Sequence, residues 1–146
     1  MIVLAFALSA ILLVITSLHV YWGIGGIWPG RDAASCARAV VGTRGVTEMP
    51  STFACFAVAA CLVLATLWPL ALMGVFATPF PQQGLAATSV MIALVFLGRG
   101  VLGFTSWWRR QAPEQPFARL DQSFYSPLCL LIGAGFLLLG ISQFPT

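Results

Sequence analysis

The chain has 146 residues, of which 60% are hydrophobic and only 8% are charged, and its formal net charge is +3. Soluble domains carry about 25% charged residues, so this composition excludes an ordinary soluble protein and indicates an integral membrane protein. The length allows several membrane spans with modest loops but no separate soluble domain, so we expect one domain over residues 1–146.

Four apolar runs predict the membrane spans, at about residues 2–21, 52–75, 85–106 and 127–142. Each is close to the roughly 20 residues that an α-helix needs to cross the hydrocarbon core. The predicted fold class is an all-α integral membrane protein, with four transmembrane helices in an antiparallel up-down-up-down bundle. The two long loops are expected to contain short interfacial helices, because a free connection of nearly thirty residues is unusual.

The first run carries a stripe of polar atoms that ends in the sole histidine of the chain. At 100° per residue, one helical face contains Ala5, Ser9, Leu12, Thr16 and His19. We expect this face to pack against the other helices. His19 is either a hydrogen-bonded structural residue or a candidate catalytic acid/base.

The segment "HVYWGIGGIWP" follows, from His19 to Pro29. Its aromatic residues suit a membrane interface, and its glycines allow a sharp turn. The glycine spacing does not match G-x-G-x-x-G and follows no strand, which excludes a nucleotide-binding loop. Next, Asp32 is predicted to cap a short helix, "AASCARAVV", that ends at Gly42.

In the third run, Arg99 lies about seven residues, or roughly 10 Å, inside the predicted helix end at Ser106. An ionisable residue at such depth is by default a functional hypothesis with a partner. The predicted partners are Asp121 and Glu48. Alternatively, the side chain extends to the interface and serves structure alone.

The last loop contains "PFARLDQSF", in which Phe117, Leu120 and Phe124 fall at helical spacing, opposite the polar residues Arg119, Asp121 and Gln122. This pattern predicts a helix lying in the membrane interface. Asp121 and Tyr125 are four residues apart, so a continuous α-helix would make them neighbours. Ser126 is predicted to be the N-cap of the fourth span.

Orientation follows from six arginines in the two long loops and none in the connection on the opposite side: Arg31, Arg38, Arg44, Arg109, Arg110 and Arg119. This bias predicts that both long loops are cytoplasmic and that both termini lie outside. Four tryptophans fit an aromatic belt on the same side: Trp22, Trp28, Trp107 and Trp108.

Six residues are predicted to line one pocket that opens to the cytoplasmic leaflet: His19, Tyr21, Glu48, Arg99, Asp121 and Tyr125. An acid, a base and a cation beside an apolar cavity suit proton transfer on a lipid-like substrate, with His19 and Asp121 as the catalytic candidates. The same groups would equally hold an anionic head group. The remaining alternative is that they are interface anchors and ties between helices.

The sequence lacks the residues that redox, haem, zinc or proton-transport sites require. The four cysteines form no Cys-x-x-Cys pair, and one histidine cannot supply a bis-histidine haem or a typical zinc site. No acidic residue lies in a predicted span, which disfavours a proton-driven transporter. We expect no metal, no cofactor and no nucleic-acid partner.

Two motifs, "HVYWGIGGIWP" and "FARLDQSFYSPLCLL" (residues 117–131), resemble a family of short bacterial four-span membrane proteins, which is a domain of unknown function. The resemblance implies the four-helix architecture and a bacterial inner (plasma) membrane, but no activity. Arg99 belongs to neither motif. The motif positions are His19, Tyr21, Trp22, Gly25, Gly26, Asp121, Tyr125, Pro127 and Cys129.

Three functions follow as hypotheses. The first is a bundle whose cytoplasmic-side pocket binds a membrane lipid or another amphipathic ligand. The second is an accessory subunit of a larger membrane complex, for which glycine-rich helix surfaces would provide contacts; a homo-oligomer is the related alternative. The third is a membrane enzyme doing acid/base chemistry on an isoprenoid, sterol-like or quinone substrate. Whether the chain is an enzyme stays open.

Overall fold

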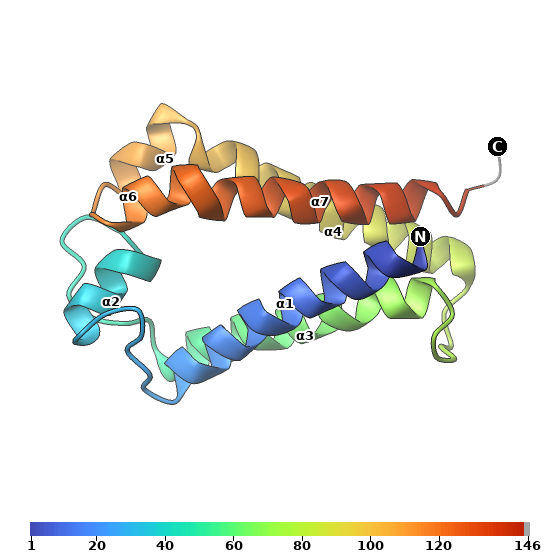
Figure 1. The fold of residues 1–146 in the computed structure, drawn as a ribbon, viewed down its shortest axis with the longest axis horizontal. Helices are drawn as coiled ribbons and strands as arrows, with labels where there is room; N and C mark the ends of the chain where they lie inside the picture. The colour runs from blue at the N-terminus through green and yellow to red at the C-terminus, as the bar shows by residue number, and fades with distance from the viewer. Residues whose placement is uncertain (145–146) are drawn as a thin grey trace.

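The computed structural model describes residues 1–144, which contain helices and no strand. Within this part of the chain, four helical segments are long and apolar enough to cross a membrane: α1 (Ile2–Gly23), α3 (Thr52–Leu72), α4 (Gln82–Gly103) and the segment Phe117–Ile141. The last segment consists of α6 (Phe117–Leu120), a π-helical turn η1 (Asp121–Tyr125) and α7 (Ser126–Ile141). The predicted all-α, four-span membrane fold is confirmed (Figure 1).

The helices differ from the predicted spans by three residues at three ends, of which the first is the start of α4 at Gln82 rather than at residue 85. α3 ends at Leu72 rather than at residue 75, because Gly74 leaves the helix with a φ of +69°. α4 ends at Gly103 rather than at residue 106, because the Thr105 side chain accepts a hydrogen bond from the Trp108 N–H and starts a new helix, α5 (Ser106–Gln111). Arg99 consequently lies one turn from the end of α4 and not two.

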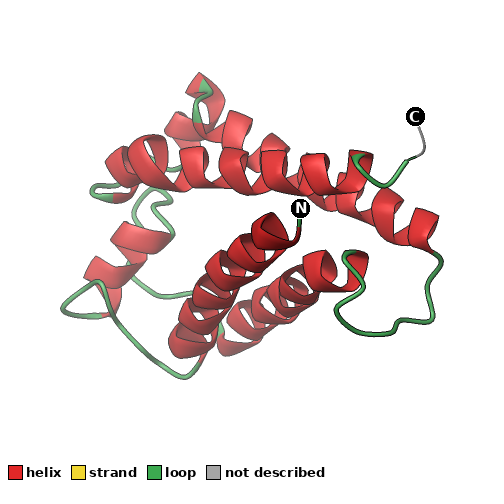
Figure 2. Ribbon diagram, turned by 45° about the vertical axis from the view of Figure 1, so that its right-hand side comes forward, coloured by secondary structure: helices red, strands yellow, loops and turns green. Residues whose placement is uncertain are grey.

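The four long helices form two antiparallel pairs, α1 with α3 and α4 with α7 (Figures 1 and 2). In the first pair, the buried Ser9 hydroxyl donates to the Thr66 carbonyl at 2.7 Å. In the second, the buried Ser89 hydroxyl donates to the Phe136 carbonyl at 2.9 Å. Hydroxyl-to-carbonyl bonds of this kind tie helices where lipid provides no hydrophobic driving force between them.

The two pairs meet at the end of the bundle where α1 begins, which we call the packed end (Figure 2). The buried residues that form the core lie towards this end: Ala5, Leu8, Leu12, Ala65, Ala71, Leu72, Leu85, Ala86, Ala93, Ile132, Phe136 and Leu139. The predicted inward face of α1 is confirmed for Ala5, Ser9, Leu12 and Thr16, which are all buried.

At the other end the pairs diverge, and the segments 24–51 and 104–116 lie between and beyond them (Figure 1). We call this the arginine end, since it carries the six loop arginines. The predicted loop helix is confirmed as α2 (Ala33–Val40), whose N-cap Asp32 accepts from the Ser35 N–H at 2.7 Å. That hydrogen bond lowers the pKa of the Asp32 carboxyl below its ordinary value.

The two long loops are hydrogen-bonded to each other. The Glu114 N–H donates to the Gly42 carbonyl at 3.1 Å, and the Glu114 carboxylate accepts from the Gly45 N–H at 2.9 Å. The Arg44 N–H also donates to the Gln111 carbonyl. These bonds fasten the segment that follows α2 to the one that follows α5, so the arginine end is joined through its loops.

Candidate functional site

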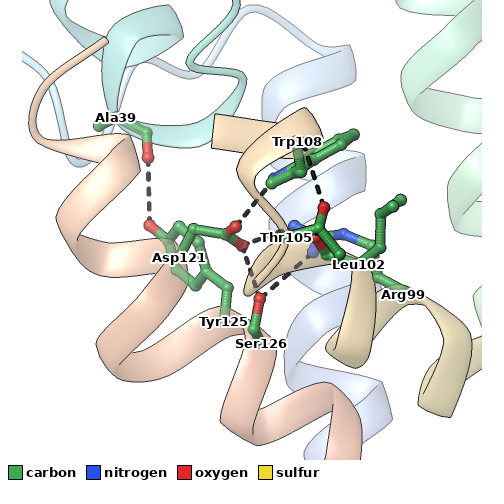
Figure 3. A network of polar contacts seen from close by, with 8 residues as sticks. All are labelled: Ala39, Arg99, Leu102, Thr105, Trp108, Asp121, Tyr125 and Ser126. Atoms are coloured by element: carbon green, nitrogen blue, oxygen red, sulfur yellow. Dashed lines mark hydrogen bonds and ion pairs between the residues drawn. The ribbon is translucent and has the colours of Figure 1, made fainter. Parts of the chain in front are cut away.

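A buried carboxylate is the centre of a polar network at the arginine end (Figure 3). The Asp121 side chain is 2% exposed and its Oδ1 forms an ion pair with Arg99 Nη2 at 2.6 Å. Ser126 Oγ donates to the same oxygen at 3.2 Å, and Trp108 Nε1 donates to Oδ2 at 2.9 Å. Three donors thus satisfy a charge that would be costly to bury alone.

The π-helical turn explains why these groups meet. In such a turn the backbone bond closes over five residues, so the Ser126 N–H donates to the Asp121 carbonyl. The residue beside Asp121 on the helix surface is therefore Ser126, five positions on. The expectation that Asp121 and Tyr125 are neighbours assumed a continuous α-helix, which the π-helical turn interrupts. Tyr125 instead donates its hydroxyl proton to the Ala39 carbonyl of α2 at 3.2 Å.

Two further expectations for this segment are wrong. Ser126 is not an N-cap: the helix continues through it, and its side chain bonds Asp121 and Arg99. Asp121 and Phe117 do not lie on opposite faces: the Asp121 N–H donates to the Phe117 carbonyl, so the two residues are one α-helical turn apart, and both are buried. Phe124, predicted to share the Phe117 face, is 58% exposed. The extra residue in the π-helical turn rotates the side chains that follow the turn relative to those that precede it.

Arg99 is paired, as predicted, and with Asp121 rather than with Glu48. Its guanidinium also lies over the Trp108 ring, 4.7 Å from the ring centroid, and Nη1 donates to Ser126 Oγ at 3.4 Å. The helices approach closely here because residue 103 is glycine: a Cβ at Gly103 would overlap Ser126 Oγ. The Arg99 side chain remains 30% exposed.

A cavity of about 530 Å³ lies beside this network, between the first helix pair and the second. α1 and the segment formed by α6, η1 and the start of α7 supply most of its wall, which is largely apolar. Its lining residues are Ile15, Leu18, His19, Trp22, Trp28, Pro29, Val40, Arg99, Phe117, Leu120, Phe124, Tyr125, Leu128 and Cys129.

The His19 ring is fixed in one orientation within this wall. Its Nδ1 lies 2.8 Å from the Ile15 carbonyl oxygen, and because a carbonyl can only accept, Nδ1 carries the hydrogen. Trp22 packs edge-on against the ring at 5.2 Å, and its own Nε1 donates to the Trp28 carbonyl at 2.7 Å. In a neutral ring, His19 Nε2 is then an unprotonated acceptor.

The structure brings together only some of the six predicted pocket residues. His19, Arg99 and Tyr125 line the cavity, while Asp121 is paired with Arg99 and does not line it. Tyr21 and Glu48 are exposed and lie outside the lining, and the Tyr21 hydroxyl accepts from the Trp28 N–H at 3.4 Å. Tyr21 therefore holds the turn that follows α1 rather than a ligand.

Sequence reasoning missed the roles of Trp108 and Ser126. Trp108 was assigned to the aromatic belt, whereas its indole N–H donates to Asp121. A half-buried indole N–H needs a hydrogen-bond acceptor. The chain has only four acidic residues, so a contact between Trp108 and one of them could have been considered from the sequence. The position of Ser126 beside Asp121 depends on the π-helical turn, which the sequence pattern did not indicate.

The cysteines are free thiols and form no disulfide within the described residues. Burial raises the pKa of the Cys36 thiol, which favours its neutral form and disfavours redox chemistry. Cys129 differs from the others because it lines the cavity.

Comparison with known proteins gives a family and no activity. A family model described as a protein of unknown function (DUF3995) matches residues 12–136. That range includes every residue of the cavity lining. No curated protein and no solved structure matches the chain.

Proposed function

The chain belongs to the DUF3995 family of proteins of unknown function, and we propose from its own geometry that it binds a lipid or another amphipathic molecule in the cavity beside Arg99. The observation that carries this proposal is the composition of the cavity wall. Apolar side chains from α1, the loop after it, α2 and the segment Phe117–Ile141 surround three polar ones, His19, Arg99 and Tyr125. Mostly apolar pockets of roughly 300–1,000 Å³ with a few placed polar groups are typical of small-molecule sites.

The position of the cavity supports a ligand that enters from one leaflet. It lies in the half of the bundle near the arginine end, where the helix pairs diverge. The arginine bias favours a cytoplasmic location for this end, in a bacterial plasma membrane. The ligand then comes from the cytoplasmic leaflet, whose anionic lipids also attract the loop arginines.

A cavity-filling substitution tests the proposal. Cys129→Phe places a ring in the cavity, and Cys61→Phe is the matched control, because Cys61 is an exposed thiol on α3. Each variant would be extracted from its own membrane into native nanodiscs, and the bound molecules identified by mass spectrometry. We expect one enriched amphipathic molecule with the wild type and with Cys61→Phe, and its loss with Cys129→Phe. The same bound molecules in all three samples would contradict the proposal.

The same spectra test the accessory-subunit hypothesis. A protein partner at fixed stoichiometry would appear as the same added mass in the wild type and in Cys61→Phe. In that case the cavity would be covered by, or shared with, the partner. We would then expect Cys129→Phe to change the amount of bound partner.

Acid/base catalysis on an isoprenoid, sterol-like or quinone substrate is a second candidate, favoured by His19 in the cavity wall, whose Nε2 is free to accept a proton when the ring is neutral. Asp121 is less suited to this role, since all its bonds are made within the network. His19→Gln should abolish turnover without loss of folded protein. Lipid extracts from cells that lack the protein, complemented with wild type or His19→Gln, would report such turnover.

A further inference from the structure

We infer that the head group of the bound molecule is uncharged and carries a hydroxyl, as in a long-chain alcohol. The inference rests on the proposed function, because it specifies what the same cavity binds.

The charge of the wall is already balanced. Among the lining residues Arg99 is the one permanently charged side chain, and Asp121 neutralises it at 2.6 Å. An anionic head group would have to compete with a carboxylate that is 2% exposed and held by three donors. A cationic head group would find no carboxylate in the lining. An uncharged head group meets neither obstacle.

The hydrogen-bonding groups of the wall are of both kinds. His19 Nε2 accepts, since Nδ1 carries the hydrogen. The Tyr125 hydroxyl gives its proton to Ala39, so its oxygen is left to accept. Arg99 can only donate, and its contacts with Asp121 and Ser126 use two of its five N–H groups. A complementary head group must therefore both donate and accept.

A hydroxyl is the simplest uncharged group that does both, with one donor and two acceptor lone pairs. An ether, an ester or a quinone oxygen can only accept. Such a group would leave His19 Nε2 without a partner in a largely apolar cavity, which weakens binding. The rest of the wall, including Leu18, Leu120 and Leu128, suits a hydrocarbon chain.

Three probes with the same chain test the head group: hexadecanol, hexadecyl methyl ether and hexadecyl phosphate. Binding of each would be measured by native mass spectrometry, with the full-length protein in phosphatidylcholine nanodiscs and empty nanodiscs as background. We expect hexadecanol to bind about tenfold more tightly than the ether, because one buried hydrogen bond is lost. It should also bind more tightly than the phosphate.

Substitutions on α1 connect the preference to His19. His19→Phe keeps a ring but removes the acceptor, so it should abolish the advantage of the alcohol over the ether. Ser17→Ala is the matched control: Ser17 is exposed, and its hydroxyl donates to the Leu13 carbonyl as His19 donates to Ile15. The control should keep the advantage.

Each contrary outcome identifies what failed. Equal binding of alcohol and ether by the wild type would overturn the hydroxyl inference and leave the cavity as a binding site. Tightest binding of the phosphate would overturn the inference in favour of an anionic ligand at Arg99. Absence of saturable binding for all three probes would overturn both this inference and the proposed function. The wild-type comparison needs no variant, so poor folding of His19→Phe would not affect it.

Discussion

The packed end and the arginine end of the bundle are held together by different forces. At the packed end, the two helix pairs meet through small and apolar side chains, with buried hydroxyls that bond to helix carbonyls. At the arginine end, the pairs are apart, and one ion pair with its donors stabilises the second pair. Hydrogen bonds between the two long loops connect the two helix pairs at this end.

The difference explains where a cavity can exist. Close packing between the two pairs at the packed end requires small residues, as where a Cβ on Gly135 of α7 would come 2.9 Å from Leu8 Cδ2 of α1. At the other end, the aromatic side chains of Trp22, Phe117 and Tyr125 take up more space between the elements that carry them. The cavity is thus a consequence of how the arginine end is built.

The largest expected effect is at the ion pair. Asp121→Ala leaves Arg99 and the Trp108 N–H without their acceptor, and we expect a loss of about 3 kcal/mol in the free energy of unfolding. This is the low end of the range for broken buried pairs, because Arg99 is 30% exposed and can reach water. Denaturant titration in mild detergent would measure it.

The matched control for that loss removes both charges. Arg99→Leu with Asp121→Leu should be destabilised less than Asp121→Ala alone, since no unpaired charge remains. In Asp121→Ala, the rate of thiol labelling should increase at Cys129, which lines the cavity. The labelling rates of the other cysteines should not change. An unchanged unfolding midpoint in Asp121→Ala would show that the network does not stabilise the arginine end.

A smaller effect is expected where α4 and α7 are close. Gly133→Ala places a Cβ 2.7 Å from Leu97 Cγ and 2.9 Å from the Leu97 nitrogen, so the helices must separate. We expect a loss of about 1–3 kcal/mol in the same titration. Gly98→Ala is the control, because nothing lies within 4 Å of its Cβ. It should gain about 0.5–1 kcal/mol from helix propensity. Equal effects of the two substitutions would contradict close packing at Gly133.

The smallest effect is confined to α2 and depends on pH. The Asp32 carboxyl has its pKa lowered in the folded chain, so its cap stabilises α2 fully above the ordinary value of 3.8. That contribution is lost as the pH falls through the lower, folded pKa. Amide resonances of residues 33–40 should therefore show fraying in acid, while those of the packed end should not. Asp32→Asn keeps an acceptor and should remove the pH dependence.

The sequence alone predicts most of the fold for identifiable reasons. Apolar runs mark the four spans, and Asp32 with Gly42 marks both ends of α2, because capping depends on single local residues. Asp121 was one of two candidate partners for Arg99, since a charge at that depth is by default expected to have a partner. These features depend on composition or on local chemistry.

The features that the sequence does not predict are changes of helical register. A π-helical turn inserts one residue into a helix without any breaker, so Phe117 and Phe124 still fit an α-helical pattern when they face different ways. The end of α4 at Gly103 is equally hard to predict from the sequence. Its one signal is Thr105, the N-cap of α5, and a threonine within an apolar run does not by itself indicate a helix start. The arrangement of the site depends on both features.

The fastening of α2 has a consequence for the order of assembly during synthesis. α1 and α3 lie within residues 2–72 and pack on each other, so this hairpin can form while the ribosome is still translating the second half. The acceptors and donors that hold the α2 segment, Glu114 and Tyr125, come later in the chain. α2 is therefore expected to dock after the last helix has been inserted, and the cavity to be completed as the final step of biogenesis.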